Sequence, residues 1–324
     1  MTIELPGLFD LQVNGFGGID FNNPSVTADG VAASLDRMRA TGVTRCLPTL
    51  ITSSFERFAA SARVLARISD AAIAGIHMEG PYLSPEEGAR GAHPPEHLAP
   101  ASVDDFNRRQ DAADGRIVLV TLAPEVPGAL TVIEHLVALG VRAAIGHTAA
   151  TGTQIGDAVS AGATLATHLG NGCAQVLPRH PNPIWELLAA DGVLASLIVD
   201  GHHLPPATVK AMVRAKGPER TILVTDAIAA AGCVPGPYTI GGVECSLGDD
   251  GRVSLPGTPY LAGSSLTLDR AIANTVRVTG LSIDEVIPMA STIPARYLGT
   301  TPAGSVTADW DADTAELYIR SVRP

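Results

Sequence analysis

Side chains able to do chemistry stand at the ends of short apolar runs throughout this sequence. Gln12 and Asn14 end the first run, "FDLQV", and because they are two residues apart, both would point to the same side of a strand. Later runs end in carboxylates and imidazoles, namely His77, Glu79, His147, His168, Asp200, His202, His203 and Asp226. Five of the nine histidines fall in this set, which random placement would not favour.

Carboxylates and imidazoles that converge on one point are typical of a catalytic divalent metal site. Two neutral imidazoles and a carboxylate can hold the ion and leave one position open for water. The ion lowers the pKa of that water, which makes it a nucleophile near neutral pH. Asp226, at the end of the last run, would take the proton from the water and later donate one to a leaving group.

Each of these residues also has a purely structural interpretation. Glu79 precedes Gly-Pro and could cap a turn, His147 could be an ordinary loop histidine, and Asp226 could be the N-cap of a helix. Asn14-Gly15 is a strong turn signal in its own right. It is their common placement at the ends of apolar runs that favours chemistry.

Eight apolar runs alternate with amphipathic segments, and this alternation predicts the architecture that positions these side chains. The runs are "GLFDLQV", "RCLPTLI", "AIAGIHME", "RIVLVTLAPE", "RAAIGHT", "LATHLG", "ASLIVDG" and "TILVTDA". Between them lie helix-like segments such as "VAASLDRMRATG", "TVIEHLVALG" and "PATVKAMVRAKG", each ending in Gly. Alternating strands and helices predict parallel pairing, and eight units predict a TIM-like (β/α)₈ barrel, whose catalytic groups lie at the carboxyl ends of the strands. An open doubly wound sheet is the alternative, although no GxGxxG follows the first run.

The pattern changes after the eighth run. Residues 238–257 alternate and are rich in Gly, which predicts β-hairpins. Two helices are expected over 264–280 and 282–299, followed by strands over 305–322. We therefore expect a catalytic barrel formed by residues 6–235 and 263–300, with a small β appendage formed by residues 236–262 and 301–324.

Composition excludes several classes of protein. The 324 residues are 46% hydrophobic and 17% charged, which is ordinary for a globular protein. The net charge of −11 and the lack of a basic run argue against nucleic-acid binding, whereas a small anionic substrate remains compatible if local cations meet it. The four cysteines are far apart, which predicts reduced thiols. The first residues do not resemble a signal peptide and no run is long enough to span a membrane, so we expect a cytoplasmic protein.

Eight motifs occur in an order that resembles a known family. They are "PGLFDLQVNGFGG", "GIHMEGPYLS", "RGAH", "IGHT", "THLGNG", "VDGHH", "LVTDA" and "LAGSSLTL". The set is similar to that of the amidohydrolase superfamily and, within it, the N-acetylglucosamine-6-phosphate deacetylase family, from Pro6 to about residue 300. The ordered set is highly specific, although each motif alone is weak.

The resemblance implies a metal-dependent site with assigned roles. Glu79, His147 and His168 would hold one divalent ion per chain, zinc or iron. Asp226 would be the general base and acid, and His93, in "RGAH", would contact the scissile amide and polarise its carbonyl.

The first strand indicates that a second metal is not bound. Many amidohydrolases have His-x-His there, whereas this chain has Gln12 and Asn14, and amides are poor ligands for a transition metal. Both are expected to support the ligands or face the substrate. His77, the first residue of the family's HxEG motif, is expected to orient Glu79.

Four further residues match positions that bind the substrate in this family. His203 is the substrate-binding histidine, and the backbone of Asn171 and Gly172 would meet the sugar phosphate. Arg179, eleven residues after His168, falls where the family supplies an arginine to the phosphate, often from a neighbouring subunit of a homodimer. A guanidinium binds phosphate in a fork, although Arg179 could also be a solvated surface charge.

The chain departs from the family pattern in three places. Gly170-Asn171-Gly172-Cys173 stands where an aromatic residue and Asn-Ala-Met are usual, which reduces the bulk beside the substrate pocket. The segment "PRHPNPIWELL" has Pro and His where relatives are rich in Gly. The chain also begins almost at the first strand, whereas relatives have several dozen residues before it, so we expect a reduced β appendage and altered dimer packing.

These observations predict a hydrolase that removes the N-acetyl group of an amino-sugar phosphate, N-acetylglucosamine 6-phosphate foremost. The nearest alternative is the same chemistry on an unphosphorylated N-acyl or cyclic amide. A non-catalytic metal-binding scaffold for ligand sensing is a third interpretation. Asp226 argues against the scaffold, because a sensor needs no base opposite its metal.

Overall fold

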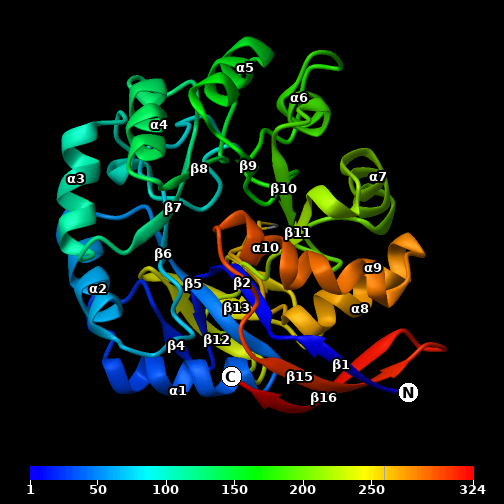
Figure 1. Ribbon diagram of the computed structural model, residues 1–324. Coiled ribbons are helices and arrows are strands. Elements are labelled where there is room, and N and C mark those ends of the chain that lie inside the picture. Colours follow the sequence, from blue (N-terminus) through cyan, green and yellow to red (C-terminus); the bar gives the residue numbers. More distant parts are fainter. Residues whose placement is uncertain (259) are drawn as a thin grey trace.

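Eight parallel strands form a nearly closed barrel (Figure 1). The computed structural model describes residues 1–258 and 260–324. The strands are β2 (Leu8–Val13), β5 (Val43–Ile51), β6 (Ile76–Glu79), β7 (Ile117–Leu122), β8 (Arg142–Ile145), β9 (Leu165–Ala166), β10 (Leu194–Leu197) and β11 (Thr221–Leu223). They pair in the order β11-β10-β9-β8-β7-β6-β5-β2, and one of them lies in each of the eight predicted runs.

The first and last strands meet, which distinguishes this barrel from an open sheet. Val13 forms a parallel bridge with Ala227, and the N–H of Asp226 donates to the carbonyl of Gln12 at 2.9 Å. The predicted barrel is therefore confirmed, and the doubly wound alternative is wrong. All six residues of β2 are buried, as expected for a parallel strand covered on both faces.

Helices surround the barrel in chain order (Figure 1). They are α1 (Ala28–Arg39), α2 (Phe55–Arg67), α3 (Val103–Ala112), α4 (Ala129–Ala138), α5 (Gly152–Ala161), α6 (Pro183–Ala189), α7 (Pro206–Lys216) and α8 (Leu268–Thr279), with short 3₁₀ turns at Pro95–His97 and Pro218–Arg220. Side chains of Thr27, Ser54, Ser102 and Thr151 cap four of them by accepting backbone N–H groups. These local signals help to fix where those four helices begin and therefore how long the loops before them are.

The helix expected over 282–299 is broken. The structure has α9 (Ile283–Val286), a 3₁₀ turn (Ile287–Ala290) and α10 (Thr292–Tyr297) instead. Pro288 lacks the N–H that a continuous helix needs at that position, so α9 stops just before it. Ser291 then adopts a non-helical conformation (φ −140°, ψ −77°) before α10 begins.

Outside the barrel, the remaining strands form two separate antiparallel sheets and a small two-stranded ladder. One sheet contains β12 (Gly236–Ile240), β13 (Val243–Leu247) and β14 (Val253–Ser254), and the ladder contains β3 (Gly15–Phe16) and β4 (Ile19–Asp20). The other sheet pairs β1 (Thr2–Pro6) and β16 (Glu316–Arg323) on either side of β15 (Ser305–Asp311). Both expected appendage segments, 236–262 and 301–324, thus supply strands, but to different sheets, and the division of the chain into domains stays a prediction.

None of the helices in the described part of the chain is both long and apolar enough to cross a membrane.

Candidate active site

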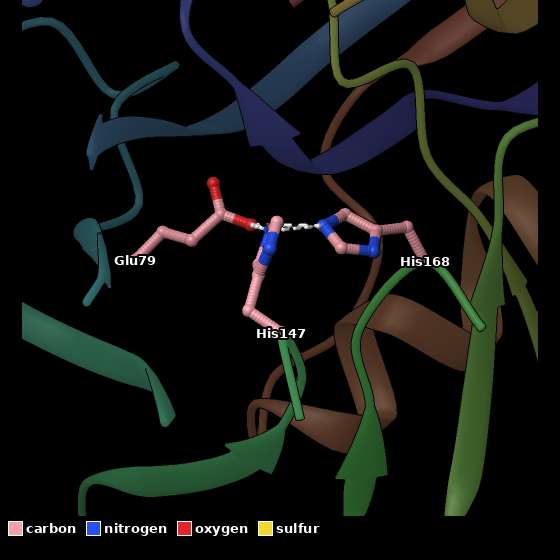
Figure 2. Close-up of side chains that lie close together, drawn as sticks. All are labelled: Glu79, His147 and His168. Atoms are coloured by element: carbon pink, nitrogen blue, oxygen red, sulfur yellow. Dashed lines mark hydrogen bonds and ion pairs between the residues drawn. The ribbon is translucent and has the colours of Figure 1, made fainter. Parts of the chain in front are cut away.

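Glu79, His147 and His168 converge at the carboxyl end of the barrel strands. Glu79 is the last residue of β6, and the two histidines follow β8 and β9. Figure 2 shows the three side chains pointing toward one another from these separate elements. His168 Nε2 lies 2.9 Å and His147 Nε2 3.3 Å from Glu79 Oε1, and the two Nε2 atoms are 3.1 Å apart.

This donor set fits a divalent transition metal. The ligand atoms of the three buried residues lie within 4.8 Å of one another. His147 Nδ1 lies 2.9 Å from the carbonyl oxygen of Ala89, so a neutral ring that donates there presents the lone pair of Nε2 to the centre. Two imidazoles and one carboxylate are a typical catalytic ligand set for zinc or iron. Gly172 packs closely on this ring, because a Cβ there would lie 2.7 Å from His147 Nδ1.

The backbone turns sharply at three of the predicted site residues. His147, His168 and Asp226 have φ values of 49°, 31° and 50°, in the left-handed region that few residues other than glycine adopt. Only Asp114 and Ala315 share this feature among the described non-glycine residues. Such strained positions cluster at functional sites. The strain is therefore an independent reason to assign these residues to a site.

Burial and mutual charge shift the ionisation of the central groups. Burial by itself raises the pKa of Glu79, but hydrogen bonds from His147 and His168 and their charges lower it well below its usual value. Burial by itself lowers the pKa of His168, but its hydrogen bond with Glu79 raises it. Burial, followed by the negative charge of Glu79, raises the pKa of Asp226 to about 6. Asp226 is thus poised to exchange a proton near neutral pH.

Asp226 does not cap a helix. It follows β11, and the next helix in the described part of the chain is α8, which begins at Leu268. Its carboxyl instead accepts a hydrogen bond from Asn14 Nδ2 at 2.7 Å. The interpretation of Asp226 as an N-cap is therefore wrong.

Gln12 and Asn14 each hold one carboxylate of the site. Gln12 Nε2 donates to Glu79 Oε1 at 2.9 Å, and Asn14 Nδ2 donates to Asp226. Both amides are buried, and both reach carboxylates of the site, as the two-residue spacing predicts. They therefore contact a predicted ligand and the predicted base.

His77 lies deeper in the barrel and bonds to neighbouring strands. Its Nε2 is 2.7 Å from Thr121 Oγ1, and its Nδ1 is 3.2 Å from the carbonyl oxygen of Leu11. Thr121 in turn contacts Thr167, the residue before His168, at 2.7 Å. No hydrogen bond joins His77 to Glu79 in residues 1–258 or 260–324. Any orienting effect on Glu79 must therefore act through the strands.

His93 lies beside the cluster. Its Nε2 is 3.2 Å from His147 Nε2, and the two rings meet edge to face. Burial, and then the charge of His147, lowers the pKa of His93 to about 3, so its ring is neutral. Its Nδ1 is buried without a partner among the described residues. A neutral imidazole at this position can donate one hydrogen bond to a substrate carbonyl.

Of the residues expected to bind the substrate, some form hydrogen bonds with their neighbours in the described part of the chain and one does not. His203 Nδ1 lies 2.7 Å from Asp200 Oδ2, and the backbone N–H of His203 donates to Asp200 Oδ1 at 2.8 Å. Asn171 uses its side chain and its N–H on the carbonyl of His168, at 3.1 and 2.9 Å. Arg179 is exposed in the loop before α6 and makes no hydrogen bond or ion pair within the described ranges.

Sequence reasoning gave no role to two residues that support the site. Asp200 fixes the ring of His203, although the sequence already marked it as a strand-end residue. Glu125, the last residue of the run "RIVLVTLAPE", accepts hydrogen bonds from Thr148 Oγ1 and the N–H of Ala149, both at 2.6 Å. It thereby anchors the segment that follows His147. The sequence did contain a signal for Glu125, because this residue, like the predicted site residues, ends an apolar run.

Known proteins resemble this chain over nearly its whole length. The family described as "Amidohydrolase family" matches residues 3–317. An N-acetylglucosamine-6-phosphate deacetylase of Bacillus subtilis is 34% identical over 96% of this chain and 80% of its own length. An N-acetylgalactosamine-6-phosphate deacetylase of Escherichia coli O157:H7 is 35% identical over 91% of this chain and 78% of its own length.

A solved structure supports the same relationship. It is a mutant N-acetyl-D-glucosamine-6-phosphate deacetylase of Mycobacterium smegmatis in complex with N-acetyl-D-glucosamine-6-phosphate. It superimposes with a TM-score of 0.91 at 34% identity and covers 99% of this chain and 85% of its own. The likeness thus extends from the motifs to the complete barrel.

Proposed function

The chain belongs to the amidohydrolase family, among the N-acetylglucosamine-6-phosphate deacetylases, and from this premise we propose that it hydrolyses N-acetylglucosamine 6-phosphate to glucosamine 6-phosphate and acetate. It is a metal-dependent hydrolase that cleaves carbon–nitrogen bonds. The observation that carries the proposal is the convergence of Glu79, His147 and His168 in a barrel that also presents the half-buried carboxyl of Asp226.

One divalent cation, zinc or iron, would be held by Glu79, His147 and His168. Bound there, it supplies the Lewis acidity that activates a water and polarises an amide carbonyl. Gln12 and Asn14 hold Glu79 and Asp226 instead of adding ligands, which supports a count of one ion per chain.

The residues of this chain perform the proton transfers and bind the substrate. Asp226 takes the proton of the attacking water at its carboxylate and returns one to the nitrogen of the departing amino sugar. His93 donates a hydrogen bond to the carbonyl oxygen, where negative charge develops in the transition state. His203, fixed by Asp200, binds the sugar, and the segment at Asn171 and Gly172 meets the phosphate.

Acetate release from matched sugars tests this function. We expect turnover with N-acetylglucosamine 6-phosphate, and a kcat/KM roughly 10- to 100-fold lower with N-acetylglucosamine, because a lost charged phosphate contact costs on the order of 1.5–3 kcal/mol. N-acetylgalactosamine 6-phosphate is the second candidate, since a relative named for that sugar is 35% identical. Equal rates with phosphorylated and free sugars would refute the sugar-phosphate assignment and favour another amide.

Replacing Arg179 with Ala tests how the phosphate is recognised. We expect KM for the phosphorylated sugar to rise about 10- to 100-fold, which is the range of one charged hydrogen bond. KM for the free sugar should hardly change. Arg214→Ala, which removes an exposed arginine from α7, is the matched control and should leave both values unaltered. If Arg179→Ala raises both KM values equally, Arg179 has a structural role.

The exposure of Arg179 makes the oligomeric state part of this test. The guanidinium has no partner on its own chain in the part that the structure describes, so it is available to the phosphate site of a second copy. Mixing Arg179→Ala chains with chains that carry a disabled metal site should restore turnover if the arginine acts between subunits. A lack of restoration in a mixed dimer would place Arg179 on its own active site.

A further inference from the structure

The turn that carries Asp226 is bridged by a single hydroxyl. Thr225 Oγ1 accepts a hydrogen bond from the N–H of Ala227 at 3.1 Å, so the bond closes over Asp226. The same hydroxyl donates to Asp10 Oδ2 at 2.5 Å, and the N–H of Thr225 donates to Asp10 Oδ1 at 3.2 Å. Asp10, on the first barrel strand, thus holds Thr225 at the end of the last one. Thr225 immediately precedes Asp226, whose backbone is left-handed.

A second segment holds the same turn from the other side. Ser264 Oγ donates to the carbonyl of Thr225 at 2.5 Å, and the N–H of Ser264 donates to the carbonyl of Asp226 at 3.1 Å. The N–H of Ile228 donates back to the carbonyl of Ser264 at 3.0 Å. A Cβ on Gly263, whose φ is +74°, would lie 2.4 Å from Ile228, so only glycine allows this approach. These contacts give the motif "LAGSSLTL" a physical role.

Every side chain of this arrangement is shielded from water. Asp10, Thr225 and Ser264 are 1%, 3% and 1% exposed. Water therefore cannot replace a lost partner, and removing the hydroxyl of Thr225 would leave Asp10 Oδ2 and the N–H of Ala227 unsatisfied. The three residues hold Asp226 through its backbone neighbours, while Asn14 holds its carboxyl directly.

We propose that Thr225, clamped between Asp10 and Ser264, is a positioning residue that holds Asp226 in its left-handed conformation and so aims its carboxyl into the active site. The inference rests on the proposed role of Asp226 as base and acid. It assigns to Thr225 an effect on the chemical step and none on substrate or metal binding, because the metal ligands and the substrate-binding residues come from other strands and loops.

The substitutions Thr225→Val and Thr225→Ser test it. Valine keeps the shape and removes the hydroxyl, and we expect kcat to fall on the order of 10- to 100-fold, since a displacement of about 1 Å can cost 10²-fold. KM and metal content should stay within about twofold of the wild type. Serine keeps the hydroxyl and should restore most of kcat. Thr221→Val removes a buried hydroxyl at the opposite end of β11, where Thr221 bonds to the Gly217 carbonyl, and should leave kcat unchanged.

A double substitution separates this inference from the role of Asp226. If Thr225 acts through Asp226, Thr225→Val should cost little further kcat in an Asp226→Asn background. An equal loss in both backgrounds, or an impaired Thr225→Ser, would overturn the positioning role. Near-normal kcat in Asp226→Asn alone would instead refute the base assignment. If Thr225→Val does not fold, Ser264→Ala can take its place, because it removes the hydrogen bond that holds Thr225 from the other side. The same changes in kcat are then expected in both backgrounds.

Discussion

Replacing Asp226 with Asn should lower kcat by about 10²- to 10⁴-fold while the protein keeps its metal. This range is what general acid–base catalysis contributes to enzyme rates. An amide cannot take the proton of a water or give one to an amine, whereas its size matches that of the carboxyl. Asn is also among the few residues that accept a left-handed backbone, so the φ of 50° at this position is tolerated.

The contacts of Asp226 make this substitution a clean one. The oxygen of the new amide can still accept the hydrogen bond from Asn14 Nδ2, which is 2.7 Å long in the native protein. None of the three clustered side chains proposed to hold the metal is changed. A loss of kcat with normal metal content therefore reports the missing proton transfer.

Metal content must be measured on the same preparation as kcat. Asp105→Asn is a suitable control, because Asp105 pairs with Arg109 at 2.8 Å on α3, outside the barrel. It should leave kcat unchanged. If Asp226→Asn binds metal and turns over at a near-normal rate, Asp226 has no part in the mechanism. His93 and His203 are then the next candidates for the base.

The barrel could be predicted from the sequence because its signals are local. Each apolar run is short, and all but the last are followed directly by a segment with helical spacing, so short windows suffice to count the units. Polar residues at the ends of the runs mark the catalytic mouth, because parallel strands bring those ends together. The broken helix over 282–299 also had a local signal, since Pro288 interrupts it.

The partners within the site could not be predicted in the same way. The two-residue spacing places Gln12 and Asn14 on one side of a strand, but their partners are 67 and 212 residues away. The bond from Asn14 depends on the closure of the barrel between β2 and β11, and the bond from Gln12 depends on the register of β2, β5 and β6. The pairing of β1 with β15, where Thr2 faces Asp309, is equally distant in sequence.

The left-handed backbone at His147 and His168 could not be predicted from the sequence either, for a related reason. Histidine is enriched among non-glycine residues with a positive φ, but most histidines have an ordinary backbone, so the residue types of His147 and His168 do not by themselves predict their φ values. The strain is imposed by the surroundings, such as the close packing of Gly172 on His147 and the anchoring of Thr148 by Glu125. Such over-determined turns arise from tertiary structure alone.

Replacing His147 should remove the metal and the activity together. The wild-type protein, purified without chelator, should contain close to one equivalent of zinc or iron per chain. Removing a residue that only supports a ligand typically costs 10- to 100-fold in metal affinity, so removing a ligand should cost more. We therefore expect less than about 0.1 equivalent of metal in the variant after dialysis, and turnover reduced in proportion.

His147→Asn tests the role of the imidazole more directly than His147→Ala does. Asn accepts the φ of 49° readily, whereas Ala would add backbone strain to the loss of the imidazole. His135→Ala, on α4, removes a histidine side chain that hydrogen-bonds to Asn107 and packs edge to face on Phe106, and it should keep both metal and turnover. Glu79→Gln and His168→Asn should behave like His147→Asn, because the three side chains share one centre. A His147→Asn protein that retained a full equivalent of metal and normal turnover would show that His147 is an ordinary loop histidine. Two tightly held equivalents of metal in the wild-type protein would contradict the single-ion site.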